Sequence, residues 1–136
     1  MLDSYLKSNN FDECIDYAIY NLKLENLDKA IDYIHEAMIQ NDSSAKTHNL
    51  LGIVAEKQGN LELACRHYRA SYYLDQTFEA SSNNLERITS YSYVYKSEKI
   101  DYGEEIKIFN DKAYDIVYDI VYDERKIGRL QKIKNL

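Results

Sequence analysis

The chain has 136 residues and a formal net charge of −6, with 45% hydrophobic and 29% charged residues. This length and balance are typical of one soluble globular domain with a buried core. The acidic balance argues against a general nucleic-acid-binding protein, which needs a basic face to displace counterions. There is no proline and there are only four glycines, so long helices are favoured, because both residues destabilise helix interiors.

The cysteines and the N-terminal residues indicate where the protein works. Cys14 and Cys65 are far apart in the sequence and form no CxxC pair, so we expect two reduced thiols. The first residues lack a basic stretch followed by an apolar one, and no apolar run is long enough to span a bilayer. We therefore expect a cytoplasmic protein with no membrane association.

Residues 11–44 show the pattern of two helices joined by a short turn. Apolar residues recur every three or four positions over 11–24 and again over 28–40, as on the buried face of a helix. Residues 25–27 form the expected turn, and the polar residues 41–44 end the second helix. This segment therefore predicts a helical hairpin.

Residues 45–78 repeat this plan after about 34 residues. Gly52 lacks a side chain at a place where two helices can approach closely, and Gly59 suits the left-handed conformation that ends a helix. Small and aromatic residues then alternate along the second helix, at Ala64, Tyr68 and Ser71. A period of this length is typical of a helix–turn–helix solenoid.

The repeat resembles the tetratricopeptide repeat (TPR) family. That family has Leu-Gly early in the first helix, glycine at the turn, and Ala, an aromatic residue and Ala in the second helix. The matching residues of the second copy are Leu51-Gly52, Gly59, Ala64, Tyr68 and Ser71. The first copy keeps Ala30 and Ala37 but has Tyr17-Ala18, Glu25 and Ile34 at the other positions. The resemblance implies an all-α fold: an α-α superhelix of about two and a half helical hairpins with a C-terminal helical extension.

The remaining sequence divides into the first helix of a third repeat and an extension. Residues 79–95 continue the helical pattern and are expected to form a partial third repeat that caps the core, so the TPR-like domain spans 1–95. Residues 96–136 are a Tyr-, Asp- and Ile-rich extension. Within it, 104–124 fits either a helix or strands, and we favour a helix because no glycine, proline or Asn-Gly turn separates two strands. On that helix an apolar ridge suited to self-association would contain Ile116, Val117, Ile120 and Val121.

The resemblance also implies a binding groove, because in this family the first helix of each repeat lines the concave face. The groove residues expected from the three first helices are Asp12, Ile15, Asp16, Ile19, Lys23, Lys46, Asn49, Leu50, Ile53, Glu56, Lys57, Asn83, Asn84, Arg87 and Tyr91. Four apolar members are expected to be exposed toward the groove: Ile15, Ile19, Leu50 and Ile53. The sequence does not decide whether the groove is open or occupied by the C-terminal segment. An exposed isoleucine-rich groove suggests an apolar helix as ligand, and the chain's own C-terminal segment is one candidate.

Motifs for catalysis are missing from the sequence. There is no phosphate-binding glycine loop, no HExxH and no evident Ser/His/Asp pattern. A metal site would require His48, His67 and Cys65 to converge, and RNA binding would rest on the basic residues 125–134. We expect neither of these, and no enzymatic activity or cofactor.

The sequence thus predicts a non-enzymatic protein–protein interaction module, a TPR adaptor or scaffold that binds a partner peptide or helix in its groove. The alternative is a structural protein that dimerises through the C-terminal ridge. The sequence does not identify the partner.

Overall fold

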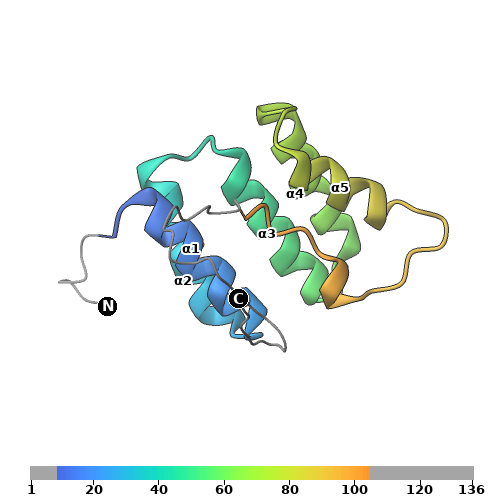
Figure 1. Ribbon diagram of the computed structural model, residues 1–136, viewed down its shortest axis with the longest axis horizontal. Coiled ribbons are helices and arrows are strands. Elements are labelled where there is room, and N and C mark those ends of the chain that lie inside the picture. The colour runs from blue at the N-terminus through green and yellow to red at the C-terminus, as the bar shows by residue number, and fades with distance from the viewer. Residues whose placement is uncertain (1–8, 105–136) are drawn as a thin grey trace, which may run out of the picture. The chain divides into compact units, whose positions relative to one another are not determined.

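The structure, a computed structural model, describes residues 9–104 (Figure 1). Five α-helices follow one another: α1 (Phe11–Lys23), α2 (Leu27–Gln40), α3 (Ala45–Lys57), α4 (Leu61–Leu74) and α5 (Glu79–Ile88). A short 3₁₀ turn, η1 (Ser97–Lys99), comes after them. No strand occurs among residues 9–104, and the predicted all-α fold is confirmed.

The helices pack as hairpins that stack in chain order. The two hairpins are α1 with α2 and α3 with α4, while α5 packs against α4 (Figure 1). The hairpins are joined where α2 meets α3, and α1 also meets α3. This arrangement is that of an α-α superhelix.

The chain divides into two units, 1–104 and 105–136. All the helices above belong to the first unit. The expected helix at 104–124, its apolar ridge and the basic residues 125–134 lie outside the described residues. Within residues 9–104 no helix combines the length and apolar character that a membrane crossing requires.

Side-chain caps explain where the first helix of each hairpin begins. Asn10 forms a capping box with Glu13: Asn10 Oδ1 accepts from Glu13 N (2.8 Å), and Asn10 N donates to Glu13 Oε1 (3.1 Å). One repeat later, Ser44 Oγ accepts from Lys46 N (3.1 Å) at the start of α3. The polar residues between the repeats therefore act as helix starts.

The turns inside the two hairpins adopt the same left-handed backbone conformation. Gly59 has φ +83°, as the sequence predicts, and Glu25 at the matching position of the first hairpin has φ +64°. A residue with a Cβ atom is strained there, whereas glycine is not. The carboxylate of Glu25 accepts a hydrogen bond from Lys57 Nζ of the neighbouring hairpin (2.9 Å), and this contact holds the strained turn in place.

Gly52 is required by the contact between α3 and α4. A Cβ atom at this position would lie 2.5 Å from Cε1 of Tyr68, whose side chain is fully buried. The first hairpin has Ala18 and Ile34 at the matching positions, and both are also buried. Glycine is thus paired with the larger tyrosine in the second hairpin, and alanine with the smaller isoleucine in the first. The two pairs fill the core of each hairpin in different ways.

The helix of the partial third repeat, α5, is shorter than the sequence predicts. It ends at Ile88, so the prediction of a helix to Tyr95 is wrong. The residues after Ile88 are rich in hydroxyl side chains that bond to nearby backbone. Thr89 Oγ1 donates to Leu85 O (2.7 Å), and Ser90 Oγ accepts from Ser92 N (3.2 Å). Such local bonds compete with helical ones and end the helix.

Candidate functional site

Residues 97–104, which we call the strap, run back along the face formed by the first helix of each hairpin and α5. Figure 1 shows the strap in orange in front of α3. It contacts all three helices: Lys23 Nζ of α1 binds Glu104 Oε1 (2.7 Å), Asn49 Nδ2 of α3 donates to Asp101 O (3.1 Å), and Asn83 Nδ2 of α5 donates to Asp101 Oδ2 (2.8 Å). We call this surface of α1, α3 and α5 the first-helix face.

Two buried asparagines hold the main chain of the strap. Asn84 Nδ2 donates to Asp101 O (2.8 Å), and Asn84 Oδ1 accepts from Asp101 N (2.9 Å). Asn49 donates to the same carbonyl and accepts from Asn84 Nδ2 (2.9 Å). Both side chains are fully buried. Their amides bind the strap through the main-chain N–H and C=O of Asp101, as a neighbouring strand would.

The strap turns sharply directly after Asp101. Asp101 Oδ1 accepts from Gly103 N (2.9 Å), and Gly103 has φ +75°. A Cβ atom at Gly103 would clash with the ring of Phe78 and lie 3.3 Å from Cβ of Ala80. Gly103 is therefore required twice, by its backbone conformation and by its close approach to α5 and the residue before it.

A buried carboxylate lies beside the asparagines. The side chain of Glu56 on α3 is 0% exposed. It accepts two hydrogen bonds from the guanidinium of Arg87 on α5, one from Tyr68 OH on α4 (2.7 Å) and one from Tyr93 OH (2.8 Å). Arg87 also donates to Asn84 Oδ1 (2.9 Å), so the carboxylate and the asparagines form one network. This network joins three helices and the chain that leads to the strap.

The protonation of the network follows from these bonds. Burial favours the protonated carboxyl, but the hydrogen bonds from Arg87, Tyr68 and Tyr93 exceed that effect and lower the pKa of Glu56. Burial and the adjacent Glu56 raise the pKa of Tyr68 strongly and that of Tyr93 to about 12. The site therefore holds a carboxylate, a guanidinium and two neutral phenols at neutral pH, a set suited to structure rather than to proton transfer.

A second buried charge lies at the C-terminal end of α3. The side chain of Lys57 is 1% exposed, and its Nζ donates to Glu25 (2.9 Å) and lies 3.5 Å from Tyr95 OH. Burial opposes the charged form, but Glu25 and the neighbouring tyrosines outweigh it and raise the pKa of Lys57. Lys23, in contrast, is half exposed and lies over the ring of Tyr102, 5.3 Å from its centroid.

The structure corrects the expectation that the apolar groove residues are exposed. The four residues expected to be exposed are buried: Ile15 (6%), Ile19 (4%), Leu50 (1%) and Ile53 (0%). They belong to the hydrophobic core, together with Ile100 of the strap. The physical reason is that the strap and the packed hairpins exclude water from this surface.

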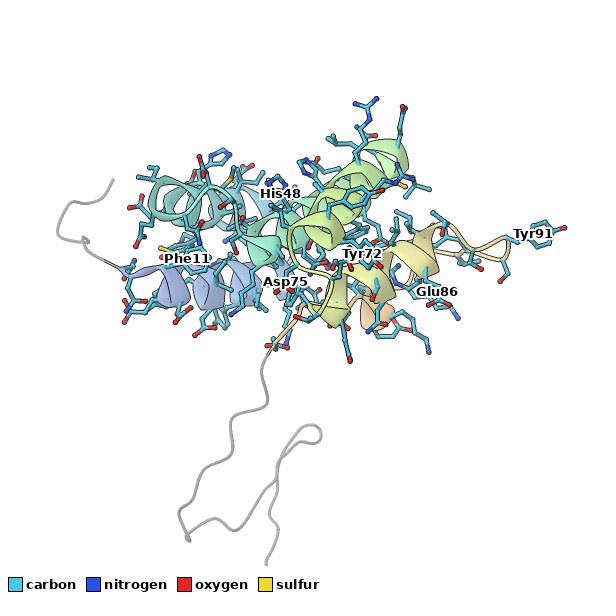
Figure 2. The ribbon with its side chains drawn as sticks, turned by 90° about the horizontal axis from the view of Figure 1, so that it is seen from above. Phe11, His48, Tyr72, Asp75, Glu86 and Tyr91 are labelled. Atoms are coloured by element: carbon cyan, nitrogen blue, oxygen red, sulfur yellow. The ribbon has the colours of Figure 1, made fainter. Side chains whose placement is uncertain are left out.

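The other expected groove residues fall into three groups. Asn49, Glu56 and Asn84 are buried and form the network above. Lys46 and Arg87 are partly exposed, Lys57 has the buried side chain described above, and Asp12, Asp16, Lys23 and Asn83 are exposed. Tyr91 lies after the end of α5 and projects away from the helices (Figure 2). The sequence analysis missed Ile100, Asp101 and Gly103, although Gly103 is one of only four glycines.

The two histidines of the second hairpin face each other, as the sequence analysis anticipated. His48 Nδ1 lies 3.4 Å from His67 Nδ1, and burial lowers the pKa of both imidazoles, with His48 adding to the effect on His67. Cys65, the third residue that such a metal site would require, accepts a hydrogen bond from Arg69. Within residues 9–104 no three His, Cys, Asp or Glu side chains come together as metal ligands.

Comparison of the chain with models of known protein families gives no match, and comparisons with curated proteins and with solved structures give none either.

Proposed function

We propose that residues 9–104 form a cytoplasmic, non-enzymatic protein-interaction module of the TPR type, whose first-helix face binds an extended peptide segment of another protein. One observation carries the proposal: the buried amides of Asn49 and Asn84, which also bond to each other, bind the main-chain N–H and C=O of a single residue, Asp101. Since every residue except proline offers the same peptide N–H and C=O, these amides suit any extended chain that reaches them.

The buried asparagines also favour an extended ligand over a helix. A helix satisfies its own main-chain groups internally, so the Nδ2 groups of Asn49 and Asn84 would lose the carbonyl that they share, which is costly for buried polar groups. The apolar residues that suggested a helical ligand are buried in the core. An extended segment, bound through main-chain hydrogen bonds and alternate side-chain pockets, is the ligand that remains.

The strap occupies this face in the free chain, so a partner has to displace it. A segment tethered by a short linker competes at an effective concentration of roughly millimolar. The ion pair between Lys23 and Glu104 of the strap is weak. The two side chains are 46% and 52% exposed, and exposed ion pairs contribute little binding free energy. The strap is therefore held mainly by Ile100 and by the hydrogen bonds to Asp101.

The test is peptide binding by a chain whose strap is released. Ile100→Asp places a charge in the core position of the strap, and Val94→Asp makes the same kind of change at a residue that is 66% exposed. A fluorescent peptide with the sequence of residues 96–104 is titrated against each full-length variant and followed by anisotropy. We expect Ile100→Asp to bind at least tenfold more tightly than wild type or Val94→Asp.

Two further measurements keep the test decisive. Far-UV circular dichroism must show that Ile100→Asp keeps its helices. If it does not, cleavage at a protease site inserted after the exposed residue Tyr91 removes the covalent tether of the strap, so that added peptide in excess can replace it. Asn84→Ala, added to the released protein, should abolish peptide binding. A folded, strap-released protein that binds no peptide would refute the proposed function.

A further inference from the structure

We propose that the first-helix face selects a five-residue pattern in its partner: an apolar residue, aspartate, an aromatic residue, glycine and an acidic residue. The inference rests on the proposed function and names the class of peptide that the face accepts. Its template is the strap segment Ile100-Asp101-Tyr102-Gly103-Glu104, every residue of which meets a separate requirement of the surface.

The apolar position is defined by burial. Ile100 is 7% exposed and joins the core cluster that contains Ile19 and Ile53. A polar side chain there would lose its contact with water without gaining a hydrogen bond. The first residue of the pattern therefore anchors the peptide in the core.

The aspartate position is defined by both its main chain and its carboxylate. Asn49 and Asn84 bind the main-chain N–H and C=O of this residue, so they set the register of the peptide without contacting the side chain at this position. The carboxylate accepts from Asn83 Nδ2 (2.8 Å) and from Gly103 N (2.9 Å). Asparagine keeps one acceptor oxygen but loses the charge, and alanine loses both bonds. This position thus selects aspartate and stabilises the turn that follows.

The glycine position is the most restrictive. The backbone has φ +75°, and a Cβ atom would clash with the ring of Phe78. An L-residue is disfavoured by its conformation and by its volume at once. A D-residue favours positive φ and carries its Cβ on the other side of Cα, so it avoids both penalties. It still makes the backbone less flexible than glycine does, and it therefore shows how much of any loss of affinity comes from flexibility alone.

The aromatic and acidic positions are both read by one ammonium group. Lys23 Nζ lies 5.3 Å from the ring centroid of Tyr102 and 2.7 Å from Glu104 Oε1. Both contacts are partly exposed to water, so each adds a small preference that salt weakens. The acidic end of the peptide is attracted to the positive charge of Lys23. This attraction sets the direction in which the peptide lies.

The test is a peptide series titrated against full-length Ile100→Asp, or against the protease-nicked chain if that variant loses its helices. The parent peptide has the sequence of residues 96–104, and single changes are made at the positions of the pattern. We expect at least a tenfold loss of affinity for Gly→Ala and for Asp→Ala. We expect a two- to threefold loss for Glu→Gln, and a smaller loss for Gly→D-Ala than for Gly→Ala.

A change in the protein provides the matched control. Lys23→Gln should bind the Glu and Gln peptides equally, because the group that distinguishes them is gone, while the penalty for Gly→Ala persists. If a scrambled peptide of the same composition binds as tightly as the parent, the pattern is wrong although the face still binds peptides. If neither peptide binds, the proposed function itself fails.

Discussion

Replacing Glu56 by glutamine tests whether the buried network holds the helices together. Glutamine keeps the shape of the side chain but removes its charge and offers one acceptor oxygen in place of two. The wild-type carboxylate is 0% exposed and accepts from Arg87, Tyr68 and Tyr93. Removing one partner of a buried ion pair costs about 3–5 kcal/mol. Because the side chain of Arg87 keeps 18% of its exposure, we expect the lower end of this range, about 3 kcal/mol.

The measurement is urea unfolding of the full chain at pH 7, followed by far-UV circular dichroism. Glu62→Gln serves as the matched control, because Glu62 forms an exposed i,i+4 ion pair with Arg66 on α4. Such pairs contribute about 0.3–0.5 kcal/mol, so this control should unfold almost as wild type does. A Glu56→Gln protein that is no less stable than the Glu62→Gln control would refute the role of the network.

The pH dependence of the stability of wild type and of Glu56→Gln adds a second check. The folded pKa of Glu56 is lowered, so the folded state binds fewer protons than the unfolded state near the usual glutamate pKa of about 4.3. The stability that Glu56 provides is therefore fully present above that pH and is lost as the pH falls through the folded pKa. The difference between wild type and Glu56→Gln should shrink below about pH 4, whereas a constant difference would mean that charge is not its source.

Three further predictions concern the second hairpin. Gly52→Ala should cost about 1–3 kcal/mol in urea unfolding, because its Cβ atom would lie 2.5 Å from Tyr68 Cε1. Combining it with Tyr68→Ile, the residue at the matching position of the first hairpin, should cost less than the sum of the two single changes. Ala64→Leu should lower the melting temperature, because Ala64 is fully buried, and an unchanged melting temperature would contradict the repeat register. The lowered pKa values of His48 and His67 mean that the folded state resists their protonation, so stability should fall as the pH drops below about 6.5, and His48→Gln should reduce that slope.

The sequence predicts the hairpins well because their determinants are local. Helical periodicity, the cap residues and the left-handed turn at Gly59 all act within one repeat. The close contact at Gly52 follows from the small-and-aromatic pattern of the same repeat. The end of α5 was missed because the apolar stripe continues to Tyr95, while the hydroxyl side chains after Ile88 bond to their own backbone.

The site could be predicted only in part, because its determinants are distant in sequence. Asn49, Glu56 and Asn84 were named from their positions on the first helices. Their partners, however, come from other helices and from the strap, and no periodic pattern connects them. The exposure of Ile15, Ile19, Leu50 and Ile53 was predicted wrongly because the helical pattern does not reveal which segment covers a helix face.

The position of the strap in the chain also sets an order of events during folding. The hairpins are built from neighbouring residues, whereas the strap bonds to Asn49 and Lys23 across 52 and 81 residues. Long closures of this kind form late, because the chain entropy they cost is recovered only once the hairpins exist. During synthesis the first-helix face is thus complete before the strap leaves the ribosome, an interval of roughly a second at typical elongation rates. On the proposed function, a partner peptide would meet the face without a competitor at that moment, and we expect it to bind a nascent chain faster than a finished one.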